Sequence, residues 1–151
     1  MINILFRAIS FLRRIYWFIF RPNTYGVKII AVSAGKVLLV KNRYDKYWYL
    51  PGGGIKKGEN SLQCARREGK EECGIVLENL KVLAEYTNIA EYKKDQITLL
   101  FGDISGQNTQ KGLEIDELGF FDMNFLPENT SSATKRRINE YLSGTITNGN
   151  W

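Results

Sequence analysis

The chain has 151 residues, of which 44% are hydrophobic and 25% charged, and its formal net charge is +5. This composition excludes a wholly disordered chain, and the length suits one globular domain with its own core. The sequence contains no histidine, which excludes a Ser-His-Asp or Cys-His catalytic arrangement and any metal site with histidine ligands. Part of the positive charge lies in the first 30 residues, and this asymmetry is compatible with contact with a membrane surface or another polyanion.

Residues 1–21, MINILFRAISFLRRIYWFIFR, are predicted to form an amphipathic helix. Their polar positions step by four, three, four and seven residues and therefore share one stripe, formed by Asn3, Arg7, Ser10, Arg14 and Arg21. The arginines at the centre speak against a transmembrane span, and the segment lacks the cleavage site of a signal peptide. Two interpretations stay open: a helix lying on a membrane surface, or one packed on its own domain or in a homodimer.

The next segments read as strands. Residues 27–42, VKIIAVSAGKVLLVKN, contain two β-branched runs about Ala34-Gly35, which predicts a hairpin, and a short aromatic strand follows until Pro51 stops it. Further strands are expected near 80–90 and 96–104 and at the later run GFFDMNFL, and a final helix is expected at about 131–142. We therefore expect one domain over residues 22–142, followed by a loose tail at 143–151.

A helix is predicted between Asn60 and Gly74. Asn60 is a suitable N-cap with Gln63 at the third helical position, and Gly74 is suited to a left-handed helix end. The expected apolar face consists of Leu62, Ala65, Gly69 and Cys73. Cys64 and Cys73 are nine residues apart and fall on opposite sides of this helix, so they cannot pair, and unpaired buried cysteines fit a reducing cytoplasm.

Three carboxylates gather on one face of this predicted helix. Glu68, Glu71 and Glu72 are related by three and four positions, and such neighbours repel one another by roughly 0.2–0.5 kcal/mol per pair. A hard divalent cation such as Mg²⁺ or Mn²⁺ would reverse that cost, because carboxylate oxygens are its preferred protein ligands. Glu59 could add a fourth carboxylate, and Arg67 could hold a carboxylate in a bidentate fork.

The loop before the helix, Gly52-Gly53-Gly54, has no side chains, so its backbone can approach a ligand and its N–H groups can face phosphate oxygens. From Gly53 onward the spacing is Gly, five residues, Glu, seven residues, Arg-Glu, two residues, Glu-Glu, one residue, Gly-Ile. This pattern resembles the Nudix box, G-x5-E-x7-R-E-U-x-E-E-x-G-U, in which U is a bulky apolar residue. The one departure is Gly69 at the first U, where a glycine would let the helix sit closer to a sheet.

The resemblance extends over about residues 22–142 and implies an α/β Nudix fold, with a mixed sheet between helices. Here the fold would carry an extra N-terminal amphipathic helix. It also implies a Mg²⁺-dependent (or Mn²⁺-dependent) pyrophosphohydrolase that cleaves a nucleoside diphosphate linked to another moiety by attack of water on phosphorus. Glu68 and Glu72 are then the principal metal ligands, Glu71 a further one, and Glu59 a supporting carboxylate held with Arg67.

The general base is expected to be a glutamate, because histidine is absent. Glu68 is the first choice and Glu71 the second, with Glu114 and Glu117 as candidates on a later loop. The expected phosphate contacts are the glycine loop, Lys56 and Arg43, with Lys41 and Lys57 as further candidates. Tyr44, Tyr47 and Trp48 could stack on a base, although core packing is an equal alternative for Trp48.

The expected partner is a nucleotide-type small molecule, and no DNA binding is expected, because no basic stripe with interleaved aromatics lies outside the first 21 residues. The protein is expected in the cytoplasm or at the inner face of the membrane. The alternative function is a Nudix-fold module that binds a nucleotide or a partner without cleaving it.

Overall fold

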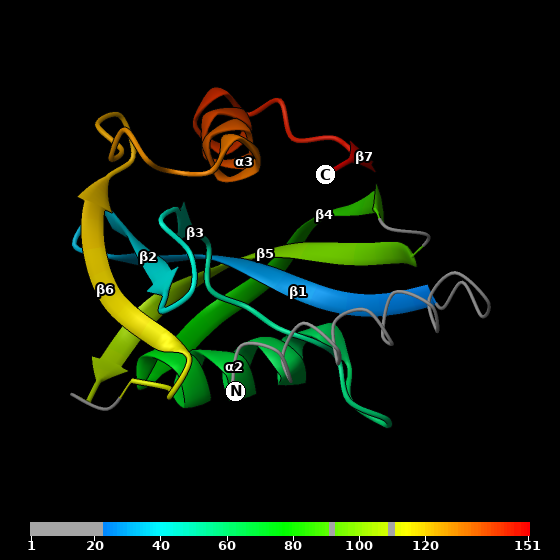
Figure 1. The fold of residues 1–151 in the computed structure, drawn as a ribbon, viewed down its shortest axis with the longest axis horizontal. Coiled ribbons are helices and arrows are strands. Elements are labelled where there is room, and N and C mark those ends of the chain that lie inside the picture. The colour runs from blue at the N-terminus through cyan, green and yellow to red at the C-terminus, as the bar shows by residue number, and fades with distance from the viewer. Residues whose placement is uncertain (1–22, 91–92, 109–110) are drawn as a thin grey trace, which may run out of the picture.

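The computed structural model describes residues 23–90, 93–108 and 111–151. They form a seven-stranded mixed sheet with a helix on each face (Figure 1). The strands are β1 (Asn23–Ser33), β2 (Lys36–Asn42), β3 (Trp48–Tyr49), β4 (Ile75–Ala90), β5 (Lys93–Gln107), β6 (Ile115–Asp122) and β7 (Gly149–Asn150), and the helices are α2 (Ser61–Cys73) and α3 (Ser132–Ser143). The predicted α/β fold is therefore confirmed, while the helix predicted at 1–21 lies outside the described residues.

The hairpin between β1 and β2 is confirmed, with Ala34 and Gly35 both at positive φ, 48° and 76°. β1 and β2 pair only next to this turn, because β2 then turns away to pair with β3 and β6. The other edge of β1 pairs in parallel with β5 along ten residue positions. Beyond the hairpin, the edge of β1 on the side of β2 is therefore available to pair with a different segment of the chain.

That segment is the glycine loop. Main-chain bonds join Val27 N to Gly53 O at 2.9 Å, Ile29 N to Pro51 O at 3.0 Å and Ile55 N to Tyr25 O at 2.9 Å. The loop is therefore fixed along β1, directly before the start of α2.

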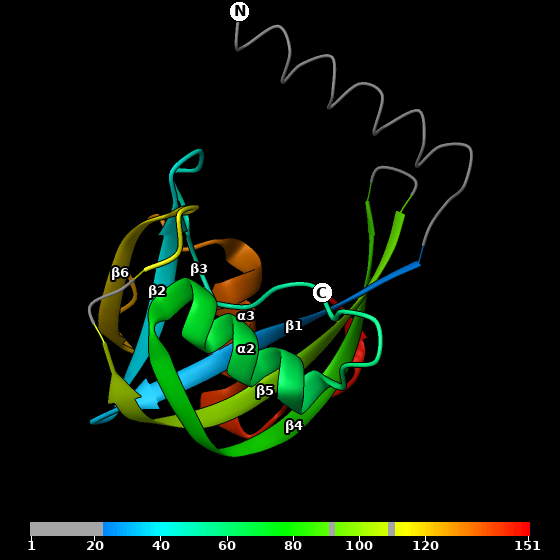
Figure 2. The same cartoon turned by 90° about the horizontal axis from the view of Figure 1, so that it is seen from below.

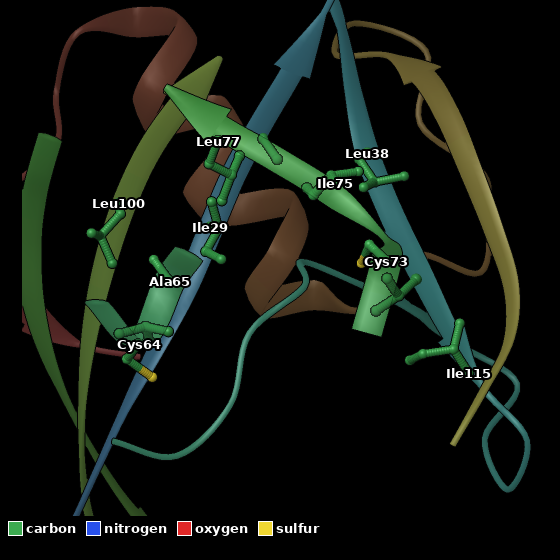
Figure 3. Packing of buried hydrophobic residues seen from close by; sticks show 12 residues of the cluster. Ile29, Leu38, Cys64, Ala65, Cys73, Ile75, Leu77, Leu100 and Ile115 are labelled. Carbon is green, nitrogen blue, oxygen red and sulfur yellow. The ribbon is translucent and has the colours of Figure 1, made fainter. Parts of the chain in front are cut away.

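Two hydrophobic clusters lie on opposite faces of the sheet. The first packs α2 against the strands, and Figure 3 shows Cys64, Ala65 and Cys73 facing Ile29, Leu38, Ile75, Leu77, Leu100 and Ile115. The second packs α3, through Ile138, against the other face. Figure 2 shows α2 lying across β1, β5 and β4, which holds the polar side of this helix away from the core.

Gly69 lies where α2 packs against β4. A Cβ added there would be 3.0 Å from Leu77 Cδ1 and 3.2 Å from Ile75 Cγ1, both tighter than ordinary contacts. The glycine thus lets the helix sit closer to the sheet, as expected from the one departure in the motif.

The strands β4 and β5 are longer than the runs near 80–90 and 96–104 from which they were predicted. They pair antiparallel from Ile75↔Gln107 to Ala90↔Lys93, with three register irregularities on the way. These irregularities interrupt the alternation of apolar and polar residues, so the sequence pattern reveals only the regular parts.

The segment after α3 differs from the loose tail expected at 143–151. β7 pairs in parallel with β4, and the ring of Trp151 packs edge-on against Tyr86 with centroids 5.5 Å apart. An aromatic side chain at the end of a polar segment thus gives the tail an anchor. Among the described residues, no helix is long and apolar enough to span a membrane.

Candidate active site

Both ends of α2 are fixed by local hydrogen bonds. Asn60 Oδ1 accepts from Gln63 N at 2.8 Å, and Asn60 N donates to Gln63 Oε1 at 3.0 Å, which is the predicted capping box. Gly74 ends the helix in the left-handed conformation, at φ 63°. The buried residues Cys64, Ala65, Gly69 and Cys73 fix the rotation of the helix about its own axis. As a result, its carboxylates lie at the edge that faces the glycine loop.

Arg67 links the carboxylates of this site. Its Nε and Nη2 atoms each lie 2.8 Å from an oxygen of Glu59, in the bidentate geometry expected from the sequence. Its Nη1 atom donates to Glu68 Oε1 at 2.6 Å and to Glu71 Oε2 at 3.1 Å. Nη2 also donates to Gly54 O at 2.9 Å, so one guanidinium joins three carboxylates to the glycine loop.

This arrangement offsets the repulsion that the sequence alone suggests. The hydrogen bonds from Arg67 lower the pKa of Glu59 to about 2, and the same pair raises the pKa of Arg67. Glu59, Glu68 and Arg67 are largely buried, with 13–18% of each side chain exposed, whereas Glu71 is 55% exposed. Glu59 is therefore held as a carboxylate, and Glu59 and Glu68 are confined in position, whereas Glu71 is not.

Glu72 is placed differently from the other carboxylates. It has no bond to Arg67, and its Oε2 atom accepts from Gly52 N at 3.1 Å. Burial raises the pKa of Glu72, and the Gly52 N–H and the charge of Lys28 act against that rise. The N–H of Gly52 is thus engaged by a predicted metal ligand in this structure, where the sequence suggested an open phosphate contact.

Two glycines of the loop lie where an added side chain would meet close neighbours. Gly52 has φ 148°, and a Cβ there would lie 2.0 Å from Val27 O. A Cβ at Gly53 would lie 2.4 Å from Glu68 Cδ. The absence of a side chain at Gly53 thus makes the space in which the Glu68 carboxylate rests.

The donor set fits a hard divalent cation by its chemistry. Glu68, Glu71 and Glu72 lie on one edge of α2, and each keeps an oxygen that Arg67 or Gly52 does not engage. Among the described residues, however, no three acidic or thiol side chains are already close enough together to hold a metal ion. A cation would therefore be bound by carboxylates that turn towards it, for which the exposed Glu71 has the most freedom.

The geometry of this loop, helix and carboxylate cluster can be set beside known proteins. A family model for the NUDIX domain matches residues 22–142, which is most of the chain. The chain belongs to the Nudix family.

Three Nudix relatives indicate the range of similarity. A protein of Bacillus subtilis (strain 168), provisionally named 8-oxo-dGTP diphosphatase, is 32% identical over 127 residues, which are 80% of this chain and 81% of that protein. The RNA pyrophosphohydrolase of Acinetobacter baylyi (strain ATCC 33305 / BD413 / ADP1) is 36% identical over 74 residues, 49% of this chain but only 43% of that enzyme. The crystal structure of a MutT NUDIX hydrolase from Burkholderia pseudomallei superposes with a TM-score of 0.69 at 26% identity, covering 78% of this chain and 97% of that one.

Membership of the Nudix family confirms the predicted class, a hydrolase of pyrophosphate (acid anhydride) bonds.

The two glutamates predicted as alternative bases lie in different surroundings. The charge of Glu114 contributes to the raised pKa of Glu72, which places its carboxylate within electrostatic reach of the site. Glu117 forms an ion pair with Lys41 across β6 and β2. Of this pair, Glu114 is the better placed for a role at the Nudix site.

The other predicted contacts spread over the neighbouring loops. Lys56 Nζ lies 3.9 Å from Glu71 Oε1, so its ammonium is beside the carboxylates. The side chain of Arg43 is exposed, and its main-chain N–H donates to Glu114 O. Tyr44 is 91% and Tyr47 40% exposed, which leaves both free to stack on a ring. Trp48 is 9% exposed and packs edge-on against Phe121, so its role is in the core.

Sequence reasoning missed Lys28. This residue lies on β1 between the buried Val27 and Ile29, and its Nζ atom donates to Leu50 O at 3.0 Å. Burial lowers the pKa of Lys28, and the charges of Glu72 and Glu68 act in the opposite direction. The signal was available in the sequence, since a lone lysine in an apolar strand with both faces covered is rare without a partner.

Proposed function

We propose that this protein is a Mg²⁺-dependent (or Mn²⁺-dependent) pyrophosphohydrolase that cleaves a nucleoside diphosphate linked to another moiety, with water as the nucleophile. The observation that carries the proposal is the arrangement around Arg67. One guanidinium orients Glu59, Glu68 and Glu71 beside a loop without side chains, and Glu72 lies next to it on the N–H of Gly52. A binding module would have no use for this concentration of carboxylates.

Each residue has a separate part in this proposal. Glu68, Glu72 and Glu71 would hold the cation, which when bound neutralises charge on the pyrophosphate and makes its water more acidic. Arg67 and Glu59 keep Glu68 oriented, through bonds of 2.6 and 2.8 Å. Glu68 is the first candidate to take the proton from the attacking water, Glu71 the second and Glu114 the third.

The substrate is proposed only as a class. One relative is provisionally named an 8-oxo-dGTP diphosphatase, and another is named an RNA pyrophosphohydrolase. A first panel therefore contains the nucleoside triphosphates, their 8-oxo-guanine forms and a short 5′-triphosphate RNA, with nucleotide sugars, dinucleotide cofactors and dinucleoside polyphosphates as the second group.

The test measures release of phosphate and pyrophosphate from this panel, with Mg²⁺ or Mn²⁺ and with a chelator. Metal-dependent turnover is expected, and Glu68→Gln and Glu72→Gln should each lower kcat/KM by about 100-fold or more, because removal of one charge-stabilising group at a reacting centre costs that much. Glu78→Gln is the matched control, since Glu78 is exposed on β4 outside the site.

The proposal fails if turnover is the same with and without the metal, or if both site variants keep wild-type activity. Tight nucleotide binding without turnover, unaffected by the metal, would instead favour the binding module.

Three further predictions from the sequence stay predictions. Cytoplasmic location, membrane contact through residues 1–21 and a homodimer concern features outside the described residues or outside a single chain. We propose the membrane-facing role only as an addition to the hydrolase.

A further inference from the structure

A cavity of about 300 Å³ lies between β1, the glycine loop and the start of β5. Its wall includes Gly52 and Gly53, and Lys28 and Thr24 of β1 and Asp95 of β5 also line it. Lys28 is the cation of this wall and lies within electrostatic reach of Glu72 and Glu68. The glycine loop lies between this cavity and the carboxylates of α2, since Gly52 in the cavity wall donates to Glu72 Oε2, and the cavity holds a partly buried ammonium.

The ammonium of Lys28 is only partly used by the protein. Among the described residues its hydrogen bond goes to Leu50 O at 3.0 Å, and no carboxylate in that part of the chain comes within 4.0 Å of Nζ. An ammonium has three N–H donors, so two remain. A cation that is partly buried without an ion pair carries a desolvation cost, which a bound ligand can compensate.

Holding the glycine loop does not explain this lysine. Three main-chain bonds already fix the loop to β1, from Val27 N, Ile29 N and Ile55 N. A neutral residue at position 28 would leave all three in place. The positive charge is therefore not needed for the position of the loop. Within the protein it acts on Glu72 and Glu68, and its hydrogen bond to Leu50 O leaves two of its N–H donors for a ligand.

We propose that Lys28 binds a phosphoryl oxygen of the substrate, next to the carboxylates of α2. This inference rests on the proposed function and adds a substrate contact to it that lies outside the glycine and glutamate motif. A phosphoryl oxygen suits the position better than a neutral base carbonyl, because the full negative charge of a phosphate compensates the partly buried cation. The remaining two N–H donors of Lys28 can then be satisfied by the substrate.

The test compares Lys28→Met, which keeps the length of the side chain and removes its charge, with the wild type. Loss of a charge-assisted hydrogen bond predicts that kcat/KM falls by about 10- to 100-fold. Lys36→Met is the matched control, because Lys36 is exposed at the start of β2, next to the hairpin turn, and it should leave kcat/KM unchanged.

Two further measurements separate substrate binding from a structural role. The inhibition constant of inorganic pyrophosphate should rise in Lys28→Met by the same factor as kcat/KM falls, and Lys28→Arg, which keeps the charge, should recover part of both. The thermal midpoint of Lys28→Met, measured with Mg²⁺, should not fall, since the variant buries one charge fewer.

The proposal is overturned if Lys28→Met keeps wild-type kinetics, or if its activity falls only together with its thermal midpoint while pyrophosphate inhibition of the folded fraction is unchanged. If Lys28→Met does not fold, Lys28→Arg provides the test. A wild-type inhibition constant for pyrophosphate together with full activity in Lys28→Arg supports a charge contact. A loss of activity in Lys28→Arg with unaltered pyrophosphate inhibition refutes it. If the wild type turns over no substrate, the proposed function fails instead, and calorimetry of pyrophosphate with Mg²⁺ on wild type and variant still tests Lys28.

Discussion

The side chains of this site take their positions from residues that carry no chemistry themselves. Glu68 rests against Gly53 because a glycine leaves room for its carboxylate. Glu72 is fixed by the N–H of Gly52, and Arg67 reaches the carbonyl of Gly54. The spacing in the motif thus reflects direct contacts between the glycine loop and the charged edge of α2.

Gly53→Ala should reduce activity without reducing stability. The added Cβ would lie 2.4 Å from the end of the Glu68 side chain, which can move aside at little cost to the fold. Displacement of a reacting group by about 1 Å can cost about 100-fold in rate. Kinetics and thermal unfolding measure the two effects, and Gly54→Ala is the control, because a Cβ there meets nothing within 4 Å. Equal activities of the two variants would contradict this role of Gly53.

At the scale of elements, α2 is the unit that combines folding and function. Its buried side sets its rotation on the sheet, its caps set its length, and its exposed edge carries the carboxylates. The chain signals most of this locally, because caps, periodicity and the motif lie within residues 52–75. For this reason the helix, its two ends and the positions of its charged residues were predictable from the sequence. The expectation that Cys64 and Cys73 fall on opposite sides of the helix was wrong about their surroundings, since both are buried in the same cluster.

Asn60→Ala should destabilise the protein by about 1 kcal/mol, the usual cost of losing an N-cap side chain. The variant removes the acceptor for Gln63 N and one half of the capping box. Urea unfolding gives the free-energy difference. Asn139→Ala, at an exposed position inside α3, is the control and should be neutral or slightly stabilising. A loss of equal size in both variants would show that the cap contributes nothing specific.

Features that depend on distant pairing were not predictable in the same way. The full length of β4, the pairing of β7 and the anchoring of Trp151 require partners more than 50 residues away, or register shifts that hide the strand pattern. Lys28 was missed for a related reason. Its role depends on a loop, Leu50 to Gly53, which the fold brings beside β1.

At the scale of the whole molecule, the two faces of the sheet pack different parts of the chain. One face packs α3 and the tail, and the other packs α2. The glycine loop and the carboxylates lie beside β1, where β1 and β2 diverge. The cavity with Lys28 opens at the same place. The central claim is that this junction holds a divalent cation against a polyphosphate, with Glu68 and Glu72 as its main ligands.

Titration calorimetry of Mg²⁺ or Mn²⁺ into the full chain tests this claim most directly, with and without imidodiphosphate, a pyrophosphate analogue that resists hydrolysis. We expect saturable metal binding that tightens in the presence of the analogue and is lost or strongly weakened in Glu68→Gln and Glu72→Gln, while Glu78→Gln binds as the wild type does. No metal binding under either condition, or the same binding in all four proteins, would contradict the account.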